Sequence, residues 1–366
     1  MKFFNLILLL LLLSNNLFAQ KEIPSYGKID QPDFAITQCD FDKDAPAYIL
    51  LQTGEVSYLR GNKYDFRIQT QKRVRIKILK PNGIENANIK LKFYSKDDFE
   101  TIEDVKGITY NIDDKGTVTS TKLESKNIYT QKLDNKYSQV VFTMPDIKVG
   151  SVFEFKYNLL RESEIQLDNW YFQEELPIRI SRYNINIPEF YEFTTQSFCY
   201  LPLDKKEVER NESMSLNSGL LKYKVADKTF TMRNIPGVHY EPYMTTPKDY
   251  MQRIEFQLSA FVNGIERKQI NNTWDKLIAA LKEDEEFGRQ LKKNLANTDA
   301  LKTKINTLTT STAKMNEVYN YVRNNMQFND VYNFWSSDGI KNAWNKHTGT
   351  SGDINLILIN LLKDAG

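Results

Sequence analysis

The stretch from His347 to Gly366, HTGTSGDINLILINLLKDAG, holds the residues best suited to chemistry. A small polar turn leads directly into an apolar run that predicts a helix. Enzymes can hold a reactive thiolate at such a helix N-terminus, because the partial positive charge there lowers the pKa of a cysteine. Here the position holds Ser351, and a serine hydroxyl is a weak nucleophile unless a base takes its proton.

The simplest role for Ser351 is structural. It is predicted to be the N-cap of the final helix, with its hydroxyl accepting a backbone N–H. Asp353 suits the positive end of the same helix. The alternatives are a serine nucleophile in a longer parent chain and a catalytic role for Asp353. The chain has only two histidines, His239 and His347, and neither is a credible base for Ser351.

Two tryptophans flank the segment SSDGIKNA shortly before this turn. Trp335 and Trp344, together with His347, are the candidate binding residues, since a loop here could line a groove for a ligand. Burial of aromatic area under the loop is the commoner use of such residues. The segment WYF at Trp170 is likewise predicted to fill a core rather than to bind a sugar.

The sequence predicts no cofactor and no metal site. It has no phosphate-binding glycine loop or dinucleotide fingerprint. The acidic segment KDDFETIEDV does not have the spacing of an EF-hand and is predicted to be a solvated turn; its acids are Asp97, Asp98, Glu100, Glu103 and Asp104. In the segment QKRVRIKILK, basic residues alternate with apolar ones. This pattern predicts that the basic side chains form the solvent-exposed face of a strand rather than a nucleic-acid patch.

The N-terminus has the features of an export signal. Lys2 precedes an apolar run from Phe3 to Leu13, and cleavage is predicted before Gln20, which makes residues 1–19 a signal peptide. We therefore expect a periplasmic or cell-envelope protein without a transmembrane span after cleavage. Removal of Lys2 lowers the net charge from +2 to +1, which gives no case for nucleic-acid binding. Whether the two cysteines, Cys39 and Cys199, form a disulfide stays open.

The rest of the chain divides by periodicity into a β-region and a helical region, an α+β fold. Residues 20–44 form an N-terminal segment, and residues 45–264 alternate apolar and polar side chains between turn signals, which predicts an antiparallel β-sandwich region. Residues 265–366 change to helical spacing. Three helices are predicted there: one from Trp274 that could extend to Leu291, one over AKMNEVYNYVRNNMQF, and the final helix after Ser351.

The chain resembles bacterial envelope proteins in which a domain of unknown function precedes a transglutaminase-like, papain-like core. The core part of the resemblance lies in VYNYVRNNMQFN and GTSGDINLILINLLKDAG. The β-region part lies in the strings RVRIKILKPNGIENANIKL, YNIDDKGTVTSTKL, FTMPDIKVGSVFEFKY, WYFQEELPI and EPYMTTPKDYMQRIEFQL.

The resemblance implies a Cys on a helix N-terminus, followed by a His and an Asp on later strands. The nucleophile motif maps onto Gly349, Thr350, Ser351, Gly352 and Asp353, so Ser351 replaces the expected Cys. The catalytic His and Asp of the family would follow Gly366. We therefore expect the core to be cut within the domain.

Three functions fit these observations. The first is a non-catalytic envelope protein whose degenerate transglutaminase-like domain binds a peptide, glycan or protein partner. The second is a transglutaminase or cysteine-protease-like enzyme acting on protein amides, represented by a truncated chain. The third is a structural component of an envelope assembly. The missing cysteine favours the first, because fold resemblance alone does not carry activity.

Overall fold

The computed structural model describes residues 23–366 apart from 62–64, 217–218, 240, 243, 245 and 271–272. The predicted signal peptide lies outside the described residues. Contacts divide the chain into two compact units, each described by itself below. The β-unit contains the chain up to Gln131 together with Gln139–Lys268, and the helical unit contains Lys132–Ser138 together with Gln269–Gly366.

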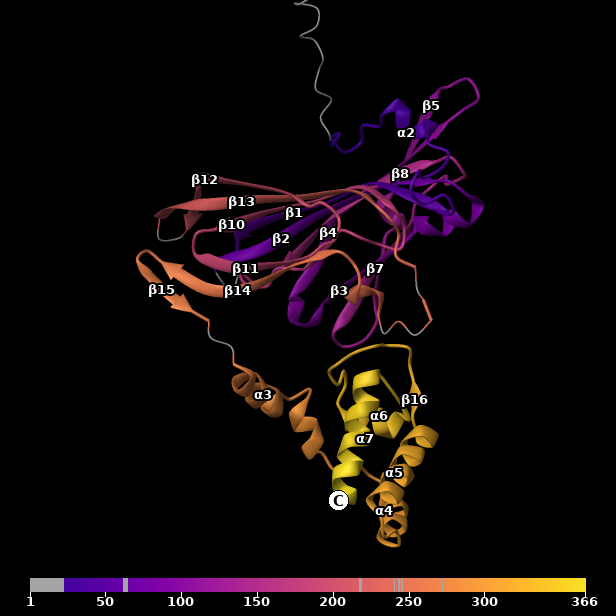
Figure 1. The fold of residues 1–366 in the computed structure, drawn as a ribbon, viewed down its shortest axis with the longest axis vertical. Coiled ribbons are helices and arrows are strands. Elements are labelled where there is room, and N and C mark those ends of the chain that lie inside the picture. Colours follow the sequence, from indigo (N-terminus) through magenta and orange to yellow (C-terminus); the bar gives the residue numbers. More distant parts are fainter. Residues whose placement is uncertain are drawn as a thin grey trace, which may run out of the picture. The chain divides into compact units, whose positions relative to one another are not determined.

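The β-unit is built on one large sheet (Figure 1). Its eight strands are, in spatial order, β12 (Asp204–Leu216), β13 (Gly219–Ile235), β10 (Ile178–Pro188), β1 (Ala47–Arg60), β2 (Phe66–Ile78), β8 (Val152–Arg161), β4 (Glu100–Ile112) and β5 (Val118–Lys122). The pairing of β1 with β10 is parallel. The prediction of a purely antiparallel region was therefore wrong at this pair, because pairing across so long a connection is invisible to local alternation.

Two smaller sheets share a core with the large one. One contains β3 (Asn88–Tyr94), β7 (Tyr137–Thr143) and β6 (Tyr129–Lys132). The other contains β11 (Tyr191–Phe198), β14 (Arg253–Asn263) and β15 (Glu266–Gln269), with β9 (Trp170–Tyr171) paired to β14. Phe142, Trp170 and Ile254 from these sheets join Ile76 and Phe153 of the large sheet in one buried cluster. The predicted β-region is thus a layered arrangement of one large sheet and two smaller ones. Together with the helices of the second unit, these sheets make a mixed α+β fold.

Trp170 packs as predicted. Its ring is 5% exposed, stacks on Tyr183 with centroids 4.8 Å apart, and donates its indole N–H to the Ser181 hydroxyl at 3.1 Å. The acidic segment differs in part from its prediction. Glu100 is buried and pairs with Arg161, because a strand begins there and turns the carboxylate toward β8, so it is not part of a solvated turn.

The basic face of β2 is buried, contrary to the prediction of a wet face. Arg75 is 1% exposed and Lys77 is 2% exposed. They are covered by the N-terminal segment, where the short helix α2 (Gln31–Ala35) lies on the side of the large sheet away from the core (Figure 1). Asp33 of α2 accepts from Arg75 at 3.1 Å, and Lys77 donates to the carbonyl of Phe34 at 3.1 Å. Burial lowers the pKa of the Lys77 ammonium.

A second buried carboxylate completes this network. Glu154 of β8 is fully buried and pairs with both Arg73 and Arg75 of β2. It also accepts the backbone N–H of Gly27 at 3.3 Å. Asp33 in turn pairs with Arg179 of β10 at 3.0 Å. Two carboxylates therefore serve three arginines and hold the N-terminal segment on the sheet.

The helical unit contains five helices among the described residues. They are α3 (Trp274–Glu283), α4 (Asp299–Asn306), α5 (Ser311–Asn325), α6 (Ile340–Lys346) and α7 (Ser351–Ala365), with the 3-10 turn η6 (Gly288–Lys292) and a short parallel pair of β16 (Gln327–Phe328) with β17 (Thr348–Gly349). The predictions of α5 and α7 are confirmed, and the polar segment between α3 and α5 forms the helix α4.

The helix α3 is shorter than the extension to Leu291 that the sequence allowed. It ends at Glu283, because Asp284 takes an extended conformation and the chain folds back through η6, so Leu291 is not part of it. A Cβ on Gly288 would lie 2.4 Å from the carbonyl oxygen of Lys282, so this return needs glycine. Trp274 and Leu277 are exposed on α3 rather than packed in a core.

Among the residues that the structure describes, no helix is both long enough and apolar enough to cross a membrane. Cys39 and Cys199 are both free thiols, so the structure has no disulfide between them. Burial raises the pKa of each thiol, which makes both weak nucleophiles at neutral pH.

We expect Glu154→Gln to lower the free energy of unfolding by about 3–5 kcal/mol, because it leaves two buried guanidinium groups without their shared counter-charge. The measurement is urea unfolding of the variant against the parent protein. The matched control is Glu207→Gln, which removes an exposed carboxylate paired with Lys228 and should change stability by less than about 1 kcal/mol. Equal effects of the two substitutions would contradict the network.

Candidate functional site

The N-terminus of α7 is closed by Thr350, not by Ser351. The Thr350 hydroxyl accepts the backbone N–H of Asp353 at 3.2 Å, and the Asp353 carboxylate accepts the backbone N–H of Thr350 at 3.1 Å, which completes a capping box. The prediction of Ser351 as N-cap was wrong by one position. Thr350 has the extended backbone that a cap requires, whereas Ser351 is already the first helical residue.

Ser351 instead joins the helix to the preceding loop. Its hydroxyl donates to the carbonyl oxygen of Asn333 at 2.9 Å and accepts the backbone N–H of the same residue at 2.9 Å. Its own N–H donates to the carbonyl of Val331 at 3.1 Å. The side chain is half-buried. Both hydrogen-bonding capacities of the hydroxyl are therefore engaged by backbone groups, and its proton points at a carbonyl, which is not a base.

Asp353 is the buried centre of the site. It is 3% exposed and accepts hydrogen bonds from Thr350 and from the hydroxyl of Ser336. Close approach of the loop to the helix also requires Gly352. A Cβ there would lie 2.7 Å from the carbonyl oxygen of Trp335 and 2.8 Å from that of Asn333. The small residues of the motif thus admit the loop, and the prediction that Asp353 suits the helix start is confirmed.

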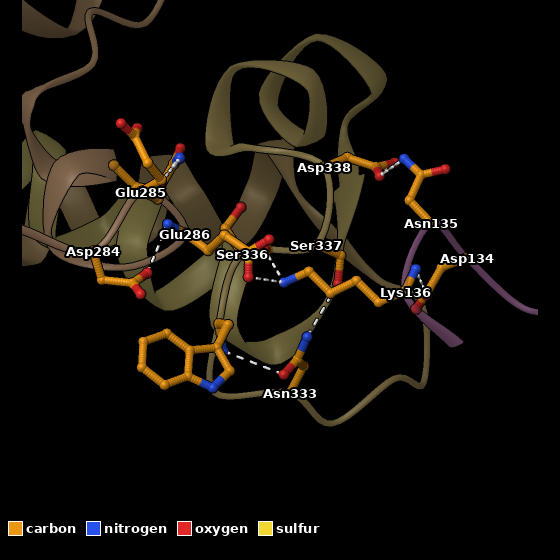
Figure 2. Close-up of polar contacts among 12 residues, drawn as sticks. Asp134, Asn135, Lys136, Asp284, Glu285, Glu286, Asn333, Ser336, Ser337 and Asp338 are labelled. Atoms are coloured by element: carbon orange, nitrogen blue, oxygen red, sulfur yellow. Dashed lines mark hydrogen bonds and ion pairs between the residues drawn. The ribbon is translucent and has the colours of Figure 1, made fainter. Parts of the chain in front are cut away.

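A lysine from a distant part of the sequence supports the same loop. Lys136, in the segment 132–138 that belongs to the helical unit, is 3% exposed. Figure 2 shows its ammonium reaching Glu286, at 2.6 Å, and the backbone carbonyl of Ser336, at 2.9 Å. Beside it Asn135 donates to Asp338. Lys136 and Asp353 therefore hold Ser336 from two sides.

The three predicted binding residues lie in different environments. Trp344 is 4% exposed and donates its indole N–H to the carbonyl of Ala296 at 2.8 Å, so its ring is part of the core of the helical unit and has no face free for a ligand. Trp335 is half-buried. His347 is exposed, ends α6 in a left-handed conformation at φ 55°, and has its Nδ1 3.0 Å from the carbonyl of Asn325.

The most exposed aromatic side chains near Ser351 were not singled out from the sequence. Tyr332 is 85% exposed and Phe334 is 63% exposed, on either side of Asn333. Phe334 stacks on Phe287 with centroids 5.0 Å apart and an interplanar angle of 9°, and Trp335 contacts both rings edge-on. The available signal was the presence of three aromatic residues within VYNFW, but a loop has no period that indicates which of its rings face the solvent.

No base accepts a proton from Ser351 among the residues that the structure describes, and His239 belongs to the β-unit. Groups of three or more histidine, cysteine or acidic side chains that could hold a metal ion are also not found in the described part. What the site offers is a buried polar framework beneath exposed aromatic rings. Such a framework fixes the shape of a loop, and the rings provide surface for contacts.

Part of the β-unit matches a known family of domains. Residues 65–225 match the family model described as "Domain of Unknown Function with solved-structure structure (DUF3857)". This match lies within the predicted β-region and confirms that part of it is a domain of unknown function. No curated protein was found to match the sequence.

A solved structure is similar in fold to most of this chain. It is a crystal structure at 2.00 Å resolution of a protein from Parabacteroides distasonis ATCC 8503, described as a "putative protease". The TM-score is 0.55 and the sequence identity is 15%, over 88% of this chain and 59% of that one. This chain thus spans well under two thirds of the length of its neighbour. At this identity the likeness is one of fold, and it extends across both the β-region and the helical region.

We expect Asp353→Asn to lower the free energy of unfolding of the helical unit by about 1.5–3 kcal/mol, because it weakens several hydrogen bonds to a buried carboxylate. Chemical unfolding followed by helix content is the measurement. Asp364→Asn, an exposed change near the other end of α7, is the control and should shift stability by no more than about 0.5 kcal/mol. Similar losses in both variants would argue against Asp353 as the centre of the site.

Proposed function

We propose that this chain is an exported envelope protein whose helical unit is a transglutaminase-like domain without a working nucleophile, which binds a peptide or protein partner. The helical unit supplies the contact surface in this proposal. The order of elements around Ser351 and the family resemblance of the motif Gly349–Asp353 support the transglutaminase-like assignment.

The observation that carries the proposal is the engagement of Ser351. A nucleophilic serine must give its proton to a base as it attacks. Here the hydroxyl donates to the Asn333 carbonyl and accepts from the Asn333 N–H. Breaking both bonds to free the hydroxyl would also remove two of the contacts that hold the loop that carries Tyr332 and Phe334. Ser351 therefore stabilises the conformation of the loop.

The exposed rings beside this loop favour a binding role. Aromatic side chains at the surface provide large contact areas at a small cost in conformational entropy. Phe334 is held in place by stacking on Phe287, so it is presented in a fixed orientation. A peptide or protein segment is the partner that such rigid aromatic anchors fit.

A second candidate is an enzyme acting on protein amides. The description of the Parabacteroides neighbour as a "putative protease" supports it, as does the papain-like resemblance of the helical region. In that case Ser351 would act as the nucleophile, and its base would be a group other than the backbone atoms that it contacts here. The two candidates differ in whether Ser351 is needed for turnover.

We expect the full protein to show no peptide hydrolysis and no incorporation of a fluorescent amine into casein. If slow turnover is found, Ser351→Ala should leave it unchanged within about twofold, because the hydroxyl has no base. The control is Asp364→Asn. Turnover that is lost in Ser351→Ala and kept in Asp364→Asn would overturn the non-catalytic assignment in favour of the second candidate.

Ser351→Cys gives an independent measure of the site. A thiol in this place has its donor directed at a carbonyl, and Asp353, two residues along the helix, adds a buried carboxylate that opposes the effect of the helix end. We expect its alkylation rate to stay within about tenfold of Cys39 and Cys199, measured by mass spectrometry of iodoacetamide adducts. Alkylation a hundredfold faster would show an activated nucleophile position.

Export has its own test. Intact-mass measurement of the protein from the envelope fraction of its own cells should give a chain that begins at Gln20. Recovery of the protein only from the cytoplasm with residues 1–19 still attached would contradict export.

A further inference from the structure

The outer face of the large sheet carries a cavity of about 500 Å³ that the proposed function does not use. Its floor is formed by β1, β2, β10 and β13, and one wall by residues 23–25 of the N-terminal segment. All of these belong to the β-unit. A volume of this size accommodates a small molecule.

The strand register explains why polar groups gather there. Thr53 of β1 is paired with Arg73 of β2 on one side and with Arg182 of β10 on the other. The three residues form one row across neighbouring strands, so their side chains leave the sheet on the same face. Two guanidinium groups therefore flank a single threonine hydroxyl in the cavity floor.

A second row lies two residues along the strands. Glu55 of β1 is paired with Asn184 of β10, and Asn184 is paired with Thr229 of β13. Side chains two residues apart on a strand share a face, so this row lines the cavity next to the arginine row. Glu55 is exposed and has no hydrogen-bond or ion-pair partner among the described residues. The cavity thus has cationic and anionic groups side by side.

Arg73 has a hydrogen-bond donor without an acceptor. The residue is 8% exposed, and its Nε donates a hydrogen bond to the Glu154 carboxylate. Its Nη2 is buried, and no acceptor for it exists in the described part of the chain. Glu154 is shared with Arg75, so the charge of Arg73 is only partly balanced. A buried guanidinium nitrogen without an acceptor is costly, and an oxyanion that reached it from the cavity would offset that cost.

Arg182 can act on the same group. Its Nε donates to the Thr231 hydroxyl at 3.0 Å, and this bond orients the guanidinium group. The residue also lines the cavity. Planar guanidinium groups match the geometry of carboxylates. A carboxylate over Thr53 would lie between the two arginines of this row, and an ammonium group of the same ligand would face Glu55.

We propose that this cavity binds a small zwitterion of the amino-acid or dipeptide class, with its carboxylate at Arg73 and Arg182 and its ammonium group at Glu55. The unpaired carboxylate of Glu55 beside the arginine row disfavours a simple dianion such as phosphate, because like charges would repel. The zwitterion balances both rows at once.

The test is calorimetric titration of the full protein with alanyl-alanine as the probe. Binding should be saturable, and amidation of the carboxylate should weaken it by roughly tenfold or more, the change expected when a charged hydrogen-bonded partner is lost. N-acetylation of the probe, which removes the ammonium group, should weaken it by roughly three- to tenfold.

Two variants assign the binding to these rows. Arg182→Gln should weaken alanyl-alanine by roughly tenfold. Glu55→Gln should weaken alanyl-alanine but leave the N-acetylated probe unchanged, because that probe has no ammonium group to lose. The matched controls are Arg233→Gln and Glu207→Gln, both exposed and outside the cavity, which should bind as the parent does. Circular dichroism of each variant confirms folding.

Three results would overturn the proposal. They are no saturable binding at probe concentrations up to roughly 50 mM in the folded protein, equal binding of the amidated and free probes, and tighter binding of inorganic phosphate than of alanyl-alanine without dependence on Glu55. The last result would make the cavity a simple anion site. None of these outcomes depends on Ser351, so the proposed function stands or falls separately.

Discussion

The β-unit depends on the need to balance charges buried on the outer face of its large sheet. Arg73, Arg75 and Lys77 leave β2 on the side away from the core, yet all three are buried. Charges out of water require paired partners, so the chain must bring carboxylates and carbonyl oxygens to them. Glu154 comes from the neighbouring strand, and Asp33 can reach only if the N-terminal segment lies across the sheet. That coverage also creates the cavity beside Arg73.

The helical unit follows the same rule on a smaller scale. The buried carboxylate of Asp353 needs donors, and it draws them from Thr350 and from Ser336 in the preceding loop. Lys136 then holds the other side of Ser336. Ser351 completes the attachment through Asn333. The start of α7 is thereby used to fix a loop, which is the physical basis for proposing binding rather than turnover.

Local patterns in the sequence were enough to predict much of this arrangement. Strict alternation in β2 and helical spacing in α5 and α7 depend on residues close together in the chain, so they survive in any fold that buries one face. The prediction of Ser351 as the cap was wrong by one position, because both Thr350 and Ser351 have side chains that can cap and only the backbone conformation distinguishes them. The exposed rings of Tyr332 and Phe334 were missed, because loops have no period to interpret.

The sequence by itself determined the alternation of strands, the change to helices after the β-region, the burial of Trp170 and the start of α7 near Ser351. Only the tertiary structure decided which distant residues meet. The parallel pairing of β1 with β10, the reach of Lys136 to Ser336 and the row of Arg73, Thr53 and Arg182 all depend on strand register or on contacts across more than a hundred residues. Such pairings are selected by the total burial and charge balance of the fold, and no local window of the sequence contains that information.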